Sequence, residues 1–215
     1  MTQRTLLFDL DGTLVDSLQD LTDAVNYARK HFSLAPISVE QTMSYIGDGQ
    51  LNLVKRAFFD AEEDLDIQQP LKILQVYYQE HLLDRTKLFP GVKETLQRLS
   101  ANCKLGVVTN KQQNAAEQVC QGLKIAELLT CIIGGGRTQN LKPHPEPLLL
   151  ALQLTGGQPD TTWMVGDHYT DLAAAAAAGC KSCFCNYGYG QTRQQKPDFR
   201  IEQFSELLEV LKLPI

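Results

Sequence analysis

The segment FDLDGT carries two aspartates, Asp9 and Asp11, one residue apart at the end of a short apolar run. Turn residues usually end such a run, so acidic side chains there indicate a further use. Two carboxylates at this spacing can divide a reaction, because one can attack phosphorus while the other transfers the proton of the leaving group. We assign the attack to Asp9 and the proton transfer to Asp11. Gly12 then turns the chain so that backbone N–H groups can approach a phosphate.

Further polar side chains follow other apolar runs. Thr109 and Asn110 end one run, Asp167 and Asp171 follow another, and Lys142 lies between them in a loop stiffened by prolines. Ligands of open parallel α/β sheets bind at the carboxyl ends of the strands. If these strands are neighbours, all of these groups converge with the first two aspartates on one crevice.

A cluster of carboxylates repels itself unless a cation lies within it, and carboxylate oxygens are ligands that Mg²⁺ prefers. The sequence therefore predicts a bound Mg²⁺. With Mg²⁺ and Lys142 offsetting the negative charge, a phosphate dianion can bind, and the Thr109 hydroxyl and Asn110 amide can donate to its oxygens. The pattern predicts a site for phosphoryl transfer.

The elements that must position these groups alternate between helix and strand from about residue 87 onward, which predicts a parallel sheet with right-handed crossovers. Residues 16–86 show helical spacing of apolar residues and no convincing strand, so we expect an all-helical unit inserted into the α/β fold. Within it, Ser38 and Gln41 form a predicted capping box. The predicted strands are 5–8, 104–109, 129–133, 162–165 and 181–184.

Composition narrows the class of protein. The 215 residues are 43% hydrophobic and 21% charged, which is typical of a globular protein of one or two domains. The net charge of −5 and the lack of a Lys/Arg-rich run argue against a nucleic-acid partner. No run approaches the roughly 20 apolar residues of a membrane span. The N-terminus lacks the pattern of a signal peptide and the six cysteines lack disulfide-scaffold spacing, so we predict a cytoplasmic protein.

Four motifs resemble those of the haloacid dehalogenase (HAD) superfamily phosphatases and come in the family's order. They are Asp9-x-Asp11-Gly12-Thr13, Thr109, Lys142 and Gly166-Asp167-x-x-x-Asp171. The resemblance implies a Rossmann-like parallel-sheet core of the HAD type, residues 1–15 and 87–215, with an inserted all-helical cap domain, residues 16–86. It also implies Mg²⁺ held by Asp9, the backbone carbonyl of Asp11 and Asp167, with Asp171 supporting. His168 stands where the family usually has Ser or Thr, so we expect different hydrogen bonds beside the metal.

The cap segment 46–57 resembles that of the phosphoglycolate phosphatases within this family. This resemblance implies hydrolysis of 2-phosphoglycolate through an aspartyl-phosphate. The candidate specificity residues are Gly47, Asp48, Gly49 and Arg56, and we name Arg56 as a candidate contact for the substrate carboxylate.

Several other functions stay open at this point. One is a sugar phosphomutase similar to β-phosphoglucomutase, and another is a phosphatase for a different small metabolite. A non-catalytic phospho-acceptor protein is less consistent with the inserted helices, and a dehalogenase needs neither a metal nor Asp11. In each enzymatic case the expected partner is a small phosphoester, with no nucleic acid and no membrane, and the protein acts as a monomer or homodimer.

Overall fold

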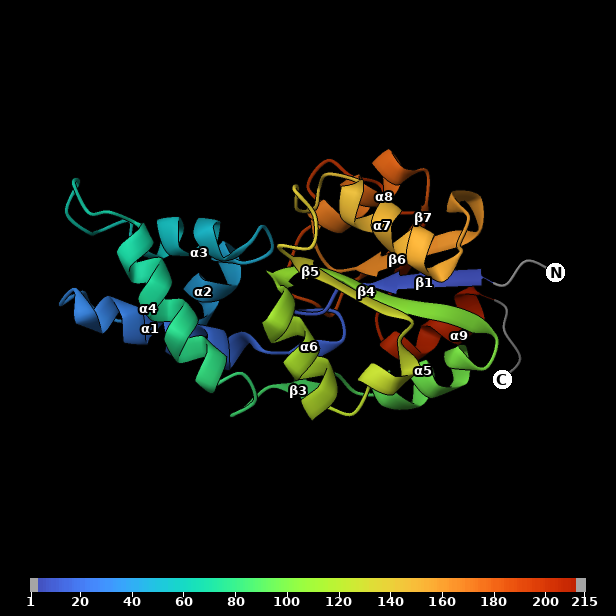
Figure 1. Ribbon diagram of the computed structural model, residues 1–215, viewed down its shortest axis with the longest axis horizontal. Coiled ribbons are helices and arrows are strands. Elements are labelled where there is room, and N and C mark those ends of the chain that lie inside the picture. The colour runs from blue at the N-terminus through green and yellow to red at the C-terminus, as the bar shows by residue number, and fades with distance from the viewer. Residues whose placement is uncertain (1–3, 212–215) are drawn as a thin grey trace.

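The computed structural model describes residues 4–211, and the main feature of these residues is a six-stranded parallel sheet (Figure 1). Its spatial order is β5-β4-β1-β6-β7-β8, and every neighbouring pair is parallel. The bounds are β1 (Arg4–Phe8), β4 (Cys103–Gln112), β5 (Cys131–Gly135), β6 (Thr162–Gly166), β7 (Lys181–Cys185) and β8 (Phe199–Ile201). The predicted α/β fold with a parallel sheet is confirmed.

Helices cover both faces of this sheet, α7 and α8 on one face and α5, α6 and α9 on the other (Figure 1). Side chains of β1 alternate between the faces: Leu7 packs in the core under α7 and α8, whereas Leu6 and Phe8 join the larger core on the opposite face. The helices are α5 (Val92–Ser100), α6 (Gln113–Gly122), α7 (Glu146–Thr155), α8 (Tyr169–Ala178) and α9 (Leu207–Val210), with one-turn 3-10 helices at Ala126–Leu128, Pro159–Thr161 and Phe204–Glu206.

The helix α8 consists largely of alanine, and its small side chains allow close packing on the sheet. Ala174 and Ala175 are fully buried against the strands, and Gly179 ends the helix in the left-handed conformation at φ 73°. The first turn of α8 therefore lies directly beside the carboxyl end of β6, where Asp167 is located.

An antiparallel pair of short strands, β2 (Val15–Asp16) and β3 (Lys87–Leu88), connects the sheet to an inserted group of helices. These are α1 (Leu18–His31), α2 (Val39–Tyr45), α3 (Gln50–Ala57) and α4 (Gln68–Glu80). They lie at the carboxyl ends of the central strands (Figure 1). The predicted all-helical character of this insertion agrees with the structure, while its division from the core as a cap domain stays a prediction.

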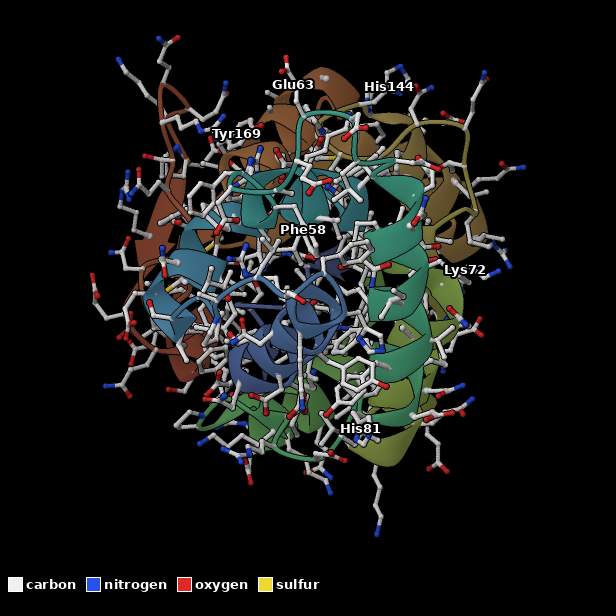
Figure 2. The ribbon with its side chains drawn as sticks, turned by 90° about the vertical axis from the view of Figure 1, so that its left-hand side faces the viewer. Phe58, Glu63, Lys72, His81, His144 and Tyr169 are labelled. Carbon is white, nitrogen blue, oxygen red and sulfur yellow. The ribbon has the colours of Figure 1, made fainter. Side chains whose placement is uncertain are left out.

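A local capping box and a longer-range ion pair stabilise the inserted helices. The predicted capping box at the start of α2 is confirmed: Gln41 N donates to Ser38 Oγ at 3.2 Å, and Ser38 N donates to Gln41 Oε1 at 2.9 Å. Arg29 of α1 is 1% exposed and donates to both carboxylate oxygens of Asp60, each at 2.8 Å. Figure 2 looks onto this group of helices, with Phe58 near its middle.

Two polar or peripheral segments differ from the sequence-based expectation. The strand β4 continues through Gln112 instead of ending at Thr109, because a register shift after Val108 lets Gln112 pair with Gly135 of β5. Polar residues give no apolar signal for such an extension. The edge strand β8 and the helix α9 were not predicted, since β8 is short and lies mostly at the surface.

Candidate active site

The strand register brings the predicted groups to one edge of the sheet. Phe8 of β1 pairs with Val107 of β4 on one side and with Val165 of β6 on the other. The residues that follow these three positions therefore emerge side by side, as expected at the carboxyl ends of parallel strands. This edge is where the structure places Asp9, Thr109 and Asp167.

Asp9 is buried at this edge. Its Oδ1 accepts a hydrogen bond from Leu10 N at 2.7 Å and lies 3.1 Å from Lys142 Nζ. Burial raises the pKa of Asp9 to about 6; Lys142 opposes this shift, and the neighbouring carboxylates Asp171 and Asp11 add to it. Lys142 therefore offsets only part of the cost of burying a charged Asp9.

Lys142 is held by three acceptors. Its Nζ donates to the Val108 carbonyl and to Asp171 Oδ1, both at 2.6 Å, besides its contact with Asp9. Burial alone would lower the pKa of Lys142, but Asp171 and Asp9 outweigh it and the pKa is raised. Asn110 fixes the loop, since Lys142 N donates to Asn110 Oδ1 and Asn110 Nδ2 donates to the Lys142 carbonyl, both at 2.9 Å.

Asp167 is the second deeply buried carboxylate. Thr13 Oγ1 donates to its Oδ1 at 2.9 Å, and the backbone N–H groups of Tyr189 and Gly190 donate to its Oδ2 at 2.9 and 3.0 Å. Burial, followed by Asp9 and other carboxylates, raises the pKa of Asp167 to about 8. Gly12 has a φ of 83°, and a Cβ there would lie 2.3 Å from Asp167 Oδ2, so the site requires glycine at this position.

Three of these carboxylates could hold a metal ion. Asp9, Asp167 and Asp171 each offer an oxygen, and these atoms lie within 4.8 Å of one another. The raised pKa values of Asp9 and Asp167 show that their burial is not fully compensated by the protein's own cations, and hard oxygen donors suit a divalent cation. Asp171 is already bound by Lys142 Nζ and by His168 N at 3.0 Å, which suits a supporting position. The donor set fits a divalent metal.

Asp11 has partners that sequence reasoning missed. Lys111 Nζ donates to its two carboxylate oxygens at 2.9 and 3.2 Å, and Ser17 Oγ donates to Oδ1 at 2.5 Å. Lys111 Nζ also donates to the Tyr78 hydroxyl of α4 at 2.5 Å. Burial disfavours a charged lysine, yet Asp11 and Tyr78 outweigh it and raise the pKa of Lys111. The one signal in the sequence was the position of Lys111 directly after Asn110.

A cavity between the sheet edge and the inserted helices collects most of the predicted residues. Its volume is about 60 Å³, several times the roughly 10–15 Å³ that one water needs, so it suits a small ligand. The predicted residues that line it are Asp9, Asp11, Gly47, Gly49, Thr109, Asn110, Asp167 and His168. Those that were not predicted are Leu21, Ile46, Gln50, Leu53, Tyr78, Lys111, Tyr189 and Gly190.

His168 is buried against the loop 46–49, which joins α2 to α3. Gly47 has a φ of 115°, and a Cβ there would lie 2.6 Å from the His168 ring. His168 Nδ1 is 3.0 Å from Thr170 Oγ1, and burial lowers the pKa of the ring to about 4, so it is neutral near pH 7. Asn110 Nδ2 also donates to the Gly47 carbonyl at 3.1 Å. These contacts of Gly47 hold the loop 46–49 against the edge of the sheet.

Arg56 lies outside the lining of this cavity. Its guanidinium donates to both carboxylate oxygens of Asp48, at 2.6 and 2.5 Å, and to the Tyr45 carbonyl at 2.7 Å. The ion pair between Arg56 and Asp48 therefore fixes the loop 46–49 to α3. The predicted contact between Arg56 and a substrate carboxylate stays a prediction.

Comparison with known proteins places these motifs in a family. The family model described as haloacid dehalogenase-like hydrolase matches residues 6–185. The chain belongs to this family. A phosphoglycolate phosphatase of Chromobacterium violaceum is 37% identical over 97% of the chain and 96% of its own length. One of Escherichia coli K12 is 36% identical over 98% of the chain and 93% of its own length.

A solved structure extends the comparison of this haloacid dehalogenase-like hydrolase to three dimensions. The protein from Haemophilus somnus, described as a predicted phosphoglycolate phosphatase, superposes with a TM-score of 0.92 at 34% identity, over 98% of this chain and 99% of that one. The resemblance drawn from the four motifs is confirmed, and the relatives support the enzyme class of phosphoric monoester hydrolases. Within residues 4–211, no helix combines the length and apolar character needed to cross a membrane.

Proposed function

We propose that this protein is a Mg²⁺-dependent phosphatase that hydrolyses 2-phosphoglycolate to glycolate and phosphate through an aspartyl-phosphate. The observation that carries the proposal is the convergence of Asp9, Asp11, Asp167 and Lys142 at one strand edge, beside a cavity for a small ligand. Relatives that bear the name phosphoglycolate phosphatase support the substrate.

Asp9 attacks the phosphorus in the first step. Leu10 N and Lys142 Nζ both contact its Oδ1, which leaves Oδ2 to form the new O–P bond as the bond to the ester oxygen breaks. Asp11 gives its proton to that ester oxygen, so glycolate leaves as an alcohol. Asp11 then accepts a proton from the attacking water, which releases phosphate and restores Asp9.

The phosphoryl group is held by Lys142 and the Thr109 hydroxyl, while Asn110 positions Lys142 through its side-chain amide. The N–H of Gly12 donates to the Val15 carbonyl at 2.9 Å, so this turn gives the phosphate room to approach. The Thr109 hydroxyl accepts from Lys111 N at 3.3 Å, so its own hydrogen can point toward a phosphate oxygen. A Mg²⁺ held by Asp9, the Asp11 carbonyl and Asp167, with Asp171 behind them, would offset the charge of the phosphoryl oxygens.

Residues 16–86 act as a cap domain on a core formed by residues 1–15 and 87–215. The cap closes over the phosphoryl group and keeps bulk water out during the first step. Contacts of the loop 46–49 with Asn110 and His168 support this role, since they join the helices to the sheet edge beside Asp9. The cytoplasmic location and the monomeric or homodimeric state stay predictions.

A phosphate-release assay tests the proposal. The purified protein is incubated with 2-phosphoglycolate, glycerol 3-phosphate, glucose 6-phosphate and β-glucose 1-phosphate, each with Mg²⁺ and after chelation. We expect Mg²⁺-dependent release with the highest kcat/KM for 2-phosphoglycolate. Phosphate release that does not depend on metal would contradict the proposed Mg²⁺ dependence. Equal rates on all esters would contradict 2-phosphoglycolate as the substrate. Conversion of β-glucose 1-phosphate to glucose 6-phosphate with little free phosphate would instead identify a mutase.

A further inference from the structure

The cavity has one permanently charged cation among its lining residues, Lys111. The other basic side chain of the lining, His168, lies against Gly47, where an added Cβ would be 2.6 Å from its ring, and its Nδ1 is 3.0 Å from Thr170 Oγ1. Lys142 is not among these lining residues, and the function proposed above assigns it to the phosphoryl group. A substrate with a negative charge beyond its phosphate therefore meets only Lys111 as a counter-charge within this lining.

Tyr78 supplies a second donor next to this lysine. It comes from α4 of the inserted helices, is 1% exposed, and accepts a hydrogen bond from Lys111 Nζ through its hydroxyl oxygen. Its hydroxyl hydrogen remains available to an acceptor in the cavity, and burial raises the pKa of Tyr78 to about 12, so the hydroxyl stays protonated. An ammonium and a hydroxyl side by side suit the two oxygens of a carboxylate.

The position of Lys111 matches the place that a carboxylate would occupy. Lys111 Nζ lies 2.9 and 3.2 Å from the oxygens of Asp11, the residue assigned to protonate the ester oxygen. In 2-phosphoglycolate the carboxylate carbon is only two bonds from that ester oxygen. A substrate that contacts Asp11 through its ester oxygen thus brings its carboxylate within reach of Lys111.

We propose that Lys111 and Tyr78 bind the carboxylate of the substrate and thereby select a phosphoester that carries one close to its phosphate. The proposal deepens the function proposed above and rests on it. It assigns to these two residues the contact that the sequence had suggested for Arg56, whose guanidinium is bound to Asp48 and Tyr45. Because Tyr78 belongs to the cap, this contact is complete only when the cap is closed.

The test compares 2-phosphoglycolate with ethyl phosphate, in which a methyl group replaces the carboxylate. The measured quantity is the ratio of the two kcat/KM values. Lys111→Met is expected to lower this ratio about 10- to 100-fold, the range for a hydrogen bond to a charged group. Tyr78→Phe is expected to lower it about 10-fold. Lys111→Arg keeps the charge and is expected to retain part of the preference.

The ratio is needed because Lys111 also holds Asp11, so Lys111→Met slows both esters. If Lys111 does no more than position Asp11, both values of kcat/KM fall equally and the proposal is overturned. A selective loss on 2-phosphoglycolate in Arg56→Met would also overturn it. Two matched controls are expected to leave the ratio unchanged: Lys104→Met, at an exposed position of the same strand, and Tyr77→Phe, whose ring stacks on Tyr27.

A second pair of esters, 3-phosphoglycerate and glycerol 3-phosphate, separates failure of the inference from failure of the proposed function. If the unmodified protein prefers 3-phosphoglycerate and Lys111→Met removes that preference, the proposed substrate is wrong and the inference stands. If it prefers 2-phosphoglycolate and Lys111→Met keeps the preference, the substrate stands and the inference is wrong. If it prefers neither carboxylated ester, both are wrong.

Discussion

Two buried lysines carry the positive charge of this site, and they serve different carboxylates. Lys142 contacts Asp9 and Asp171, whereas Lys111 contacts Asp11. When these three aspartates and Asp167 are ionised, four carboxylates face two ammonium groups, which leaves two negative charges. A divalent cation would neutralise them, and burial in a low dielectric makes that compensation worth more than it would be in water.

The first prediction at this scale concerns the nucleophile. Asp9→Asn keeps the shape of the side chain but removes the attacking carboxylate, so turnover on 2-phosphoglycolate should fall below detection. The fold should persist, because the neutral amide replaces a buried carboxyl group whose raised pKa shows that burial disfavours its charged form. Phosphate release and a thermal melt measure the two effects. Hydrolysis close to that of the unmodified protein would refute the mechanism, and Asp160→Asn, at an exposed position, is the control.

At the scale of elements, Tyr189 links the short strand β2 to the edge of the sheet that holds the buried carboxylates. Its hydroxyl donates to Asp16 Oδ1 at 2.6 Å and accepts from Ser17 N at 3.0 Å, while its backbone N–H donates to Asp167. Asp16 belongs to β2, one of the two strands through which the chain enters and leaves the helices. Tyr189 thus contacts both the strand by which the chain enters the helices and a buried carboxylate at the end of β6.

The loop 46–49 provides a prediction at the same scale. Gly47→Ala forces a Cβ into the His168 ring at a positive φ, so the cap should seat poorly and kcat/KM should fall about 10-fold or more. Gly136→Ala is the matched control, since Gly136 has a φ of 94° but nothing within 4 Å of its Cβ. Both changes should cost about 1 kcal/mol of stability from backbone strain. Equal activity of the two variants would show that the contact between Gly47 and His168 is not needed for closure.

At the scale of the whole molecule, the buried carboxylates make the stability of the metal-free protein depend on pH. The folded-state pKa values of Asp9 and Asp167, about 6 and about 8, lie above the ordinary value of 3.8. Folding therefore favours their protonated forms, and this contribution is complete below pH 3.8 and is lost as pH rises through about 6 and then about 8. Burial lowers the pKa of His168 from 6.5 to about 4, so folding favours its neutral form. Its contribution to stability therefore rises with pH, but only below about pH 6.5.

We therefore expect the melting temperature of chelated protein to fall by a few °C between about pH 6.5 and 8.5, since about 1 kcal/mol shifts it by about 2–4 °C. Saturating Mg²⁺ should largely remove the fall, because it binds the ionised carboxylates. Asp167→Asn should flatten the chelated curve. A melting temperature that rises over this range, or one that falls equally in the variant, would contradict the assignment of the slope to Asp167.

The sequence by itself determined the parallel α/β core, the all-helical insertion and the residues at the central strand ends. These features rest on local signals: apolar runs of strand length, helical spacing, and aspartates that stand directly after an apolar run, as Asp9 and Asp167 do. Parallel pairing then brings such positions together without any further information, because all strands end at the same edge.

Only the tertiary structure decided which residues bind Asp11 and which residues bind the guanidinium of Arg56. Lys111 and Tyr78 lie 33 residues apart in sequence, and Lys111 lies 100 residues from Asp11. No periodicity or spacing marks such a pair, and a lone lysine is by default a solvated surface residue. Folding buries Lys111 between Asp11 and Tyr78 of α4, while Arg56 is bound by Asp48 eight residues away. Long-range packing thus determines which cation lines the cavity, because it alone sets which charges are buried together.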